Sequence, residues 1–361
     1  MITLNRGEWS ELYCVLFLLI KPKIEIVDEN MNKITSELFE IKKIIAETNF
    51  PLEYEIINDR IIVYAVKDKI KSYTKKEIDK YRNELYKKII NNTSVSGSFS
   101  IESIEEFLRD FSLGQVLKAK NVSKEDIEVI AYDNKRKSDI NLKYSIKSSL
   151  GSPATLLNSS NHTNFKYRVI GMNDDLMKEV NSIDTRTKLL DRLNIIYNNN
   201  CSITYDSVVS DNFLYNLKMI DSSMDKYIAN TLLYSYKNNN KILKDIFISA
   251  NSFDDVQFAE KKLGDFLSAI SFGFFPGTKW NGENVVNGGL LIVTDEGNVV
   301  VLDLVYYENT VRKYLINNTQ LDSPSSTRYH MLEVFKDNDE YYFTLNLQVR
   351  YTRNFQHNID T

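Results

Sequence analysis

The segment from residue 126 to residue 148 restricts the possible folds of this chain most strongly, because apolar and polar side chains alternate in two runs joined by a polar turn. The first run is DIEVIAYD, the second is INLKYSIKS, and DNKRKSD connects them. Two such runs predict strands of an antiparallel hairpin. On the second strand, Ser145 and Lys147 share one face because side chains two residues apart point the same way.

A lysine at the end of a strand can orient or activate water beside a carboxylate that holds a metal ion, so Lys147 is a candidate catalytic residue. Asp139 lies on the same strand face, but eight residues of straight strand separate it from Lys147 by roughly 26 Å. If the hairpin pairs Tyr132 with Asp139, then Asp126 lies opposite Ser145, with about 5 Å between their Cβ atoms. We therefore expect Asp126 to be the acid of the site and Asp139 to be a turn residue.

The first helix is the expected source of a second carboxylate, because Ser145 stands where a further acid would be usual. Residues 7–20, GEWSELYCVLFLLI, have the spacing of a helix that becomes apolar all round and is therefore buried. Glu11 and, as the runner-up, Glu8 each head an apolar column of this helix. Either acid could enter a cleft, but acids are also common as solvent-facing caps in first helical turns.

Composition sets limits on the class of protein. With 361 residues, the chain can form one large or two moderate domains, and we place an uncertain boundary at residue 200, giving 1–200 and 201–361. The longest apolar run, residues 15–20, is far shorter than the roughly 18 residues of a membrane span. Two cysteines exclude a disulfide framework, no export signal opens the sequence, and a reducing cytoplasm is expected. The net charge of -4 is compatible with a basic DNA cleft on an acidic protein.

Periodicity predicts a mixed α/β fold: strands and helices in the N-terminal part, mainly helices after residue 174, and strands again from residue 288. Expected strands are 23–30, 52–66 and 165–171, and expected hairpins are 288–307 and 331–351. Expected helices are 36–47, 74–90, 101–111 with Ser100 as N-cap, 188–197 and 225–237. His162 and His330 lack metal-ligand spacing and are expected to be ordinary loop or strand residues.

Several segments together resemble the HpaII-type restriction endonucleases, which have the PD-(D/E)XK nuclease fold, a mixed sheet flanked by helices. They are GEWSELY at 7–13, KEDIEV at 124–129, SIKSSLGSPATLLNSSNHTNF at 145–165, FLSAISFG at 266–273, VVNGGLLIV at 285–293, NTQLDSPSSTRY at 318–329 and LNLQVRY at 345–351. The resemblance implies that Asp126 and Lys147 are the acid and lysine of the family. Ser145 departs from the acid usual for the fold, which leaves the number of bound metal ions open.

The resemblance also implies the reaction, a Mg²⁺-dependent hydrolysis of double-stranded DNA at a short palindrome, CCGG, leaving 5′-phosphates. Asp126 and Glu11 would hold the metal ion, and Lys147 would act on water. A homodimer on DNA and a companion DNA methyltransferase are the expected partners. A DNA-binding protein of the same fold that has lost cleavage, and a nicking or repair nuclease, are the alternatives.

Candidate DNA contacts are small hydroxyl and amide side chains after Lys147 and arginines near the C-terminus, because such groups donate to phosphates and base edges. They are Ser148, Ser149, Ser152, Thr155, Asn158, Asn164, Arg328 and Arg350, with Arg353 as an alternative to Arg350. Each arginine could equally clamp a phosphate or lie on the surface.

Overall fold

The computed structural model describes residues 2–46, 51–92, 97–114 and 124–352. The chain folds as two compact units, each with its own core, and each is described by itself. The first unit comprises the described residues of Met1–Ala154 and Asn284–Tyr314, and the second comprises Thr155–Glu283 and Leu315–Thr352. This division differs from the boundary expected near residue 200, because strands from beyond residue 284 complete the first unit.

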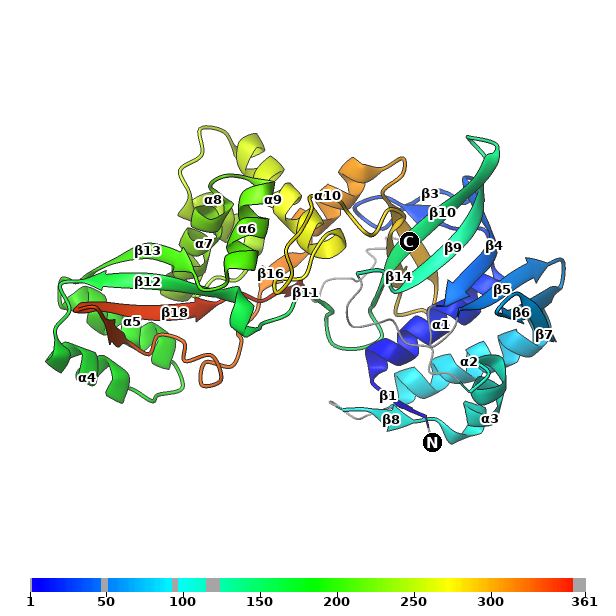
Figure 1. The fold of residues 1–361 in the computed structure, drawn as a ribbon, viewed down its shortest axis with the longest axis horizontal. Coiled ribbons are helices and arrows are strands. Elements are labelled where there is room, and N and C mark those ends of the chain that lie inside the picture. The colour runs from blue at the N-terminus through cyan, green and yellow to red at the C-terminus, as the bar shows by residue number, and fades with distance from the viewer. Residues whose placement is uncertain (1, 47–50, 93–96, 115–123, 353–361) are drawn as a thin grey trace, which may run out of the picture. The chain divides into compact units, whose positions relative to one another are not determined.

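A ten-stranded mixed sheet forms the centre of the first unit (Figure 1). Its strands, in spatial order, are β3 (Lys33–Thr35), β2 (Ile26–Val27), β15 (Val299–Asp303), β14 (Gly289–Val293), β10 (Ser138–Ser148), β9 (Ile127–Asp133), β4 (Phe39–Ala46), β5 (Leu52–Ile57), β6 (Arg60–Ala65) and β7 (Asp68–Thr74). β10 pairs with β14 in parallel, as β2 does with β15, whereas β10 pairs with β9 antiparallel. The expected mixed sheet is confirmed. A separate short pair joins β1 (Thr3–Leu4) to β8 (Phe99–Ser100).

The β9–β10 hairpin has the register expected from the sequence. Tyr132 lies opposite Asp139, and Ile127 lies opposite Tyr144, which places Asp126 beside Ser145. The prediction that Asp139 belongs to the turn was wrong, since Asp139 lies within β10. Its exposed carboxylate pairs with Lys42 at 2.5 Å, because the neighbouring strand β4 brings that lysine alongside.

Helix α1 (Arg6–Ile20) packs on the sheet against β4, β10, β14 and β15, and α2 (Lys75–Asn91) packs on α1. Figure 1 shows α1, α2 and α3 (Glu102–Phe111) on the same side of the first unit. α1 begins with a capping box between Asn5 and Glu8 and ends just before Pro22, which cannot continue a helix. Its side chains from Trp9 to Leu19 are nearly all buried, so α1 is the central helix of this core. Helix α10 (Glu308–Asn317) leads from the first unit to the second.

Three further local predictions in this unit were wrong. Residues 52–66 do not form one strand but the hairpin of β5 and β6, which turns at residues 58–59. The described part of the segment 36–47, residues 36–46, is not a helix but contains strand β4, in which Phe39 and Ile41 are buried while Glu40 and Lys42 are exposed, a period of two. Ser100 does not cap α3. It pairs with Thr3 in the β1–β8 ladder, and the cap position falls on the next residue without a side-chain hydrogen bond.

The second unit combines two small antiparallel sheets with a set of helices. One sheet has the order β11 (Thr155–Leu157), β19 (Val349–Tyr351), β16 (Thr319–Leu321), and the other has the order β13 (Ser202–Val208), β12 (Asn164–Ile170), β18 (Glu340–Asn346), β17 (Phe335–Asp337). The helices are the 3-10 turn Asn161–Thr163, α4 (Asp174–Ser182), α5 (Lys188–Asn198), α6 (Asp211–Ile220), α7 (Met224–Asn238), α8 (Leu243–Ala250) and α9 (Val256–Phe272). The two predicted hairpins correspond to β14–β15 and β17–β18 and are confirmed.

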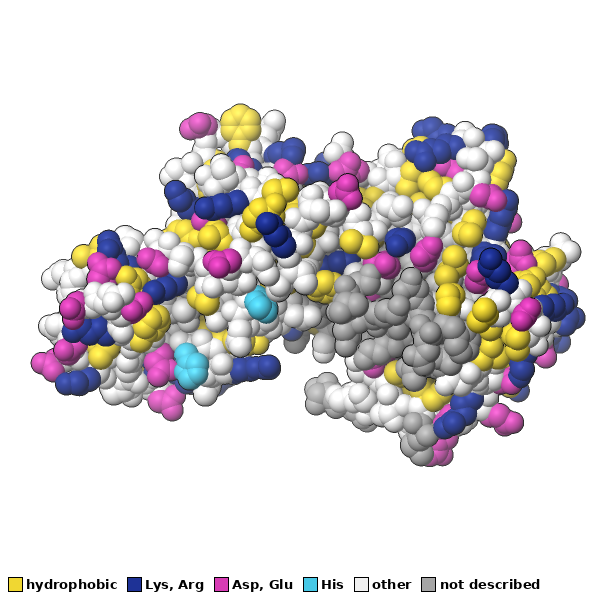
Figure 2. All heavy atoms as spheres, viewed as in Figure 1, with side chains coloured by type: hydrophobic (Ala, Val, Ile, Leu, Met, Phe, Trp, Pro, Cys, Tyr) yellow, Lys and Arg dark blue, Asp and Glu magenta, His cyan; other side chains and the backbone are white. Residues whose placement is uncertain are grey.

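The surface carries charges of both signs. On the face shown in Figure 2, Lys and Arg side chains are interspersed with Asp and Glu side chains. Among the described residues, no helix is both long and apolar enough to cross a membrane.

Candidate active site

The end of the β9–β10 hairpin brings Asp126, Ser145 and Lys147 into one hydrogen-bonded chain. The Ser145 hydroxyl donates to Asp126 Oδ2 at 3.0 Å, and Lys147 Nζ donates to Ser145 Oγ at 2.8 Å. Lys147 Nζ is 3.8 Å from Asp126 Oδ2, which forms an ion pair between side chains that are only 22% and 17% exposed. The three residues thus place a carboxylate and an ammonium group side by side in a partly dehydrated position, where their charges act strongly.

The backbone around this chain is fixed by strand pairing. Asp126 N donates to Tyr144 O at 2.8 Å, and Ile146 N donates to Asp126 Oδ2 at 2.6 Å. On its other side, β10 pairs in parallel with β14, with Lys147 opposite Ile292. β9 pairs with β10 as far as Tyr144 and β14 pairs with it from Tyr144 to Ser148, so the part of the strand that carries Ser145 and Lys147 is held by β14 and by the Asp126 carboxylate.

Helix α1 brings Glu11 toward the same position. Burial raises the pKa of the Cys14 thiol, and the negative charges of Asp126 and Glu11 raise the same pKa further, so both carboxylates lie near this thiol. Glu8 has a different role, since its carboxylate accepts from Asn5 N at 2.8 Å in the capping box. Of the two helix acids, Glu11 is therefore the one whose charge acts on the same buried thiol as that of Asp126.

Lys124 is a further cation near the site that the sequence analysis missed. Burial lowers the pKa of the Lys124 ammonium to about 7; the positive charge of Lys147 acts in the same direction, and Asp126 opposes it. Lys124 therefore lies within electrostatic range of both residues. In the sequence, Lys124 stands two residues before Asp126, which was the only indication of a role at the site. A lysine just before a strand is too common to identify a functional residue.

The Asp126 carboxylate is compatible with a metal ion that takes few ligands from the protein and keeps most of its bound water. Among the described residues, no three His, Cys, Asp or Glu side chains form a metal cluster. Asp126 accepts its hydrogen bonds from described residues at Oδ2, so its Oδ1 could bind a metal ion. Mg²⁺ commonly binds one or two carboxylates and completes its shell with water and substrate phosphate oxygens, so such an ion needs few protein ligands.

The predicted DNA contacts are distributed over both units. Ser148, Ser149 and Ser152 follow Lys147 in the first unit, whereas Thr155, Asn158, Asn164, Arg328 and Arg350 belong to the second. Three of them have side chains engaged within the protein: Ser148 Oγ accepts from Leu150 N at 3.1 Å, Asn164 Oδ1 accepts from Asn346 Nδ2 at 2.7 Å, and Arg350 pairs with Asp322 at 2.7 Å. Arg328 is exposed. Arg353 lies outside the described residues.

Comparison with known proteins gives a family match over most of the chain. The family model of the HpaII restriction endonuclease matches residues 5–351. The type II restriction enzyme HpaII of Haemophilus parainfluenzae is 29% identical to this chain over 361 aligned positions, which cover 96% of this chain and 98% of that protein. No solved structure matches the chain.

Proposed function

This chain belongs to the HpaII restriction endonuclease family and is a type II site-specific deoxyribonuclease, and we propose that Asp126, Ser145 and Lys147 form its catalytic centre. The observation that carries this proposal is the hydrogen-bonded chain from the Asp126 carboxylate through the Ser145 hydroxyl to the Lys147 ammonium. The mixed sheet that holds these residues has the restriction-endonuclease-like architecture of the family.

Asp126 and Glu11 are the residues that would hold a divalent ion, and we take Mg²⁺ as that ion. When bound, Mg²⁺ would supply positive charge to stabilise the phosphate as negative charge develops on it. Lys147 Nζ would orient the attacking water by donating a hydrogen bond to it as the ammonium, or would take the proton of that water as the neutral amine. Ser145 would keep Lys147 and Asp126 at their present separation, and the partly buried position would exclude bulk water.

The family assignment and the chemistry of the site support a more detailed proposal for the reaction. The target would be a short palindrome in double-stranded DNA, CCGG, and the products would carry 5′-phosphates. A palindrome favours a two-fold homodimer, because two identical subunits then face identical half-sites. The same proposal includes a companion DNA methyltransferase and a cytoplasmic location. A nuclease of this kind acts on DNA inside a cell, and that cell must protect its own DNA from cleavage.

The test is cleavage of plasmid DNA with Mg²⁺ by three single variants. Asp126→Asn and Lys147→Met should lose cleavage by at least roughly 1000-fold and retain DNA binding, because each removes one group of the centre. Asp139→Asn is the matched control, since Asp139 lies on the same strand face but pairs with Lys42, and it should cleave like the wild type. Loss of cleavage in the Asp139 variant with normal cleavage in the Asp126 variant would overturn the assignment.

A further inference from the structure

The loop of residues 325–334 in the second unit has a fixed backbone although most of it lies outside regular structure. Tyr329 N donates to Ser325 O at 3.2 Å, and Leu332 N donates to Thr344 O at 3.0 Å on the adjacent strand β18. His330 and Leu332 have φ angles of 48° and 53°, in the left-handed region that non-glycine residues rarely adopt. Such a conformation persists only where surrounding contacts impose it.

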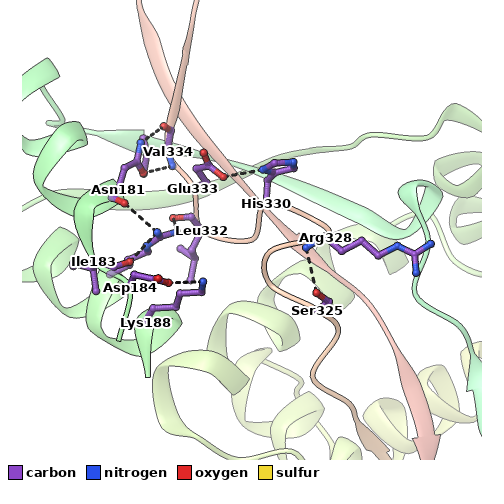
Figure 3. Close-up of polar contacts among 11 residues, drawn as sticks. Asn181, Ile183, Asp184, Lys188, Ser325, Arg328, His330, Leu332, Glu333 and Val334 are labelled. Atoms are coloured by element: carbon purple, nitrogen blue, oxygen red, sulfur yellow. Dashed lines mark hydrogen bonds and ion pairs between the residues drawn. The ribbon is translucent and has the colours of Figure 1, made fainter. Parts of the chain in front are cut away.

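Arg192 supplies one of these contacts from helix α5. Its side chain is 8% exposed, and its guanidinium donates to three main-chain carbonyl oxygens: Leu332 O at 3.2 Å, Ile183 O at 2.9 Å and Asn181 O at 3.2 Å. A buried cation requires such acceptors in place of water. The guanidinium thus ties the loop at Leu332 to the end of helix α4 (Figure 3).

Asn181 holds the next turn of the loop through its side-chain amide. Asn181 Nδ2 donates to Val334 O, and Val334 N donates to Asn181 Oδ1, both at 2.8 Å. This pair reproduces the double hydrogen bond of neighbouring strands. The Leu332 and Val334 side chains are 0% and 3% exposed, so one edge of the loop is part of the core.

The opposite edge of the loop presents Arg328 and His330 to solvent. Among the described residues, Arg328 has no ion-pair partner; its guanidinium lies 5.5 Å from the ring centroid of Tyr329, and Figure 3 shows the side chain extending away from the other residues drawn. His330 is 76% exposed, and its Nδ1 lies 2.8 Å from Glu333 Oε2, which orients the ring. The loop therefore offers a guanidinium and an oriented imidazole on a rigid support.

We propose that residues 325–334 are a preformed DNA-reading loop in which Arg328 and His330 contact base edges, and that Arg192 is the positioning residue that fixes them. This inference rests on the proposed function, because it identifies part of the surface that recognises the target. Arginine and histidine donors suit the guanine edge in the major groove. A loop ordered before binding avoids the entropy cost of ordering on DNA and holds its donors to the accuracy that base discrimination requires.

The experiment measures kcat and KM on a duplex containing the target sequence and on duplexes with single base-pair changes. Arg328→Ala and His330→Ala alter exposed side chains, so the fold should be retained, and Arg168→Ala, which removes an exposed arginine paired with Glu340, is the matched control. Each loop variant should raise KM for the target and lower the ratio of target to changed-site cleavage at least roughly 10-fold, with kcat within about 3-fold of the wild type. The control should retain the wild-type ratio.

Arg192→Met tests the positioning role at a temperature where circular dichroism shows the variant folded. It should lose discrimination as the loop variants do while kcat is kept, and Arg192→Lys should restore part of the ratio because it returns a donor to the buried carbonyls. An unchanged ratio in Arg328→Ala and His330→Ala, or equal weakening on every sequence, would overturn the reading role even if Arg192→Met fails to fold. If the wild type cleaves at no specific sequence, the proposed function fails instead, so the two failures are distinguishable.

Discussion

Ser145 is the residue in which this site differs from the pattern expected for its fold. It is 3% exposed and joins Asp126 to Lys147 through its hydroxyl, at a strand position where an acid is usual. A hydroxyl is neutral, so it can donate to a carboxylate and accept from an ammonium at the same time. A second acid at this position would bring two negative charges together; with serine there, we propose that Glu11 of helix α1 supplies the second carboxylate.

Asp303 gives a prediction about stability that is independent of cleavage. It is 0% exposed, and burial raises its pKa from the ordinary value of 3.8 to about 6, against the opposing effect of backbone N–H groups such as that of Tyr306. A carboxyl with a raised pKa binds more protons when folded, so the free energy of unfolding falls as pH rises from about 4 to about 6 and stays lower above.

Asp303→Asn removes this titration, because an amide stays neutral over the whole range. Relative to the wild type, its free energy of unfolding should improve by roughly 2 to 3 kcal/mol between pH 4 and pH 7. Urea unfolding at both pH values measures the difference, with the exposed Asp139→Asn as control. Parallel pH profiles of the Asp303 variant and the wild type would refute the linkage.

At the scale of the element, helix α1 carries two acids one turn apart with separate roles. Glu8→Ala should lower the free energy of unfolding by roughly 0.5 to 1 kcal/mol, because it removes one half of the capping box, and kcat should be kept. Glu11→Ala should keep the melting temperature and lower kcat at least roughly 10-fold, with a weaker response to added Mg²⁺. Equal kcat values in the two variants would remove Glu11 from the site.

Elements that depend on interactions between residues close in sequence could be predicted, and elements that depend on distant residues could not. The β9–β10 register follows from alternation and one short turn, so the sequence alone was enough to place Asp126 opposite Ser145. The Glu, Leu, Lys and Ala residues of the segment that contains β4 favour a helix, but the isoleucines of β4 and its place between β9 and β5 override that propensity.

The remaining features depend on contacts between distant parts of the chain. The pairing of β10 with β14 joins residues that are about 145 positions apart, and no local pattern encodes it. The same holds for Lys124, whose nearness to Lys147 arises from the fold, and for Arg192, which reads in sequence as an ordinary helix arginine but is buried against three carbonyl oxygens.

At the scale of the whole molecule, the proposed catalytic residues and the proposed DNA-reading loop belong to different units. The first unit holds Asp126, Ser145 and Lys147, and the second holds the loop with Arg328 and His330. The chain leaves the first unit after residue 154, returns at residue 284 and leaves it again after residue 314, so the second unit is built from two segments, one between strands β10 and β14 and one after β15. On the roles proposed here, separate substitutions should alter catalysis and recognition.

Sequencing the ends of the fragments made from unmethylated DNA with Mg²⁺ tests the central claim most directly. The wild type should leave 5′-phosphate ends at a single short palindrome, CCGG, and Asp126→Asn should leave none above background. Ends scattered over unrelated sequences, or the same ends from the wild type and from Asp126→Asn, would contradict a sequence-specific nuclease whose catalytic centre is the Asp126–Ser145–Lys147 chain.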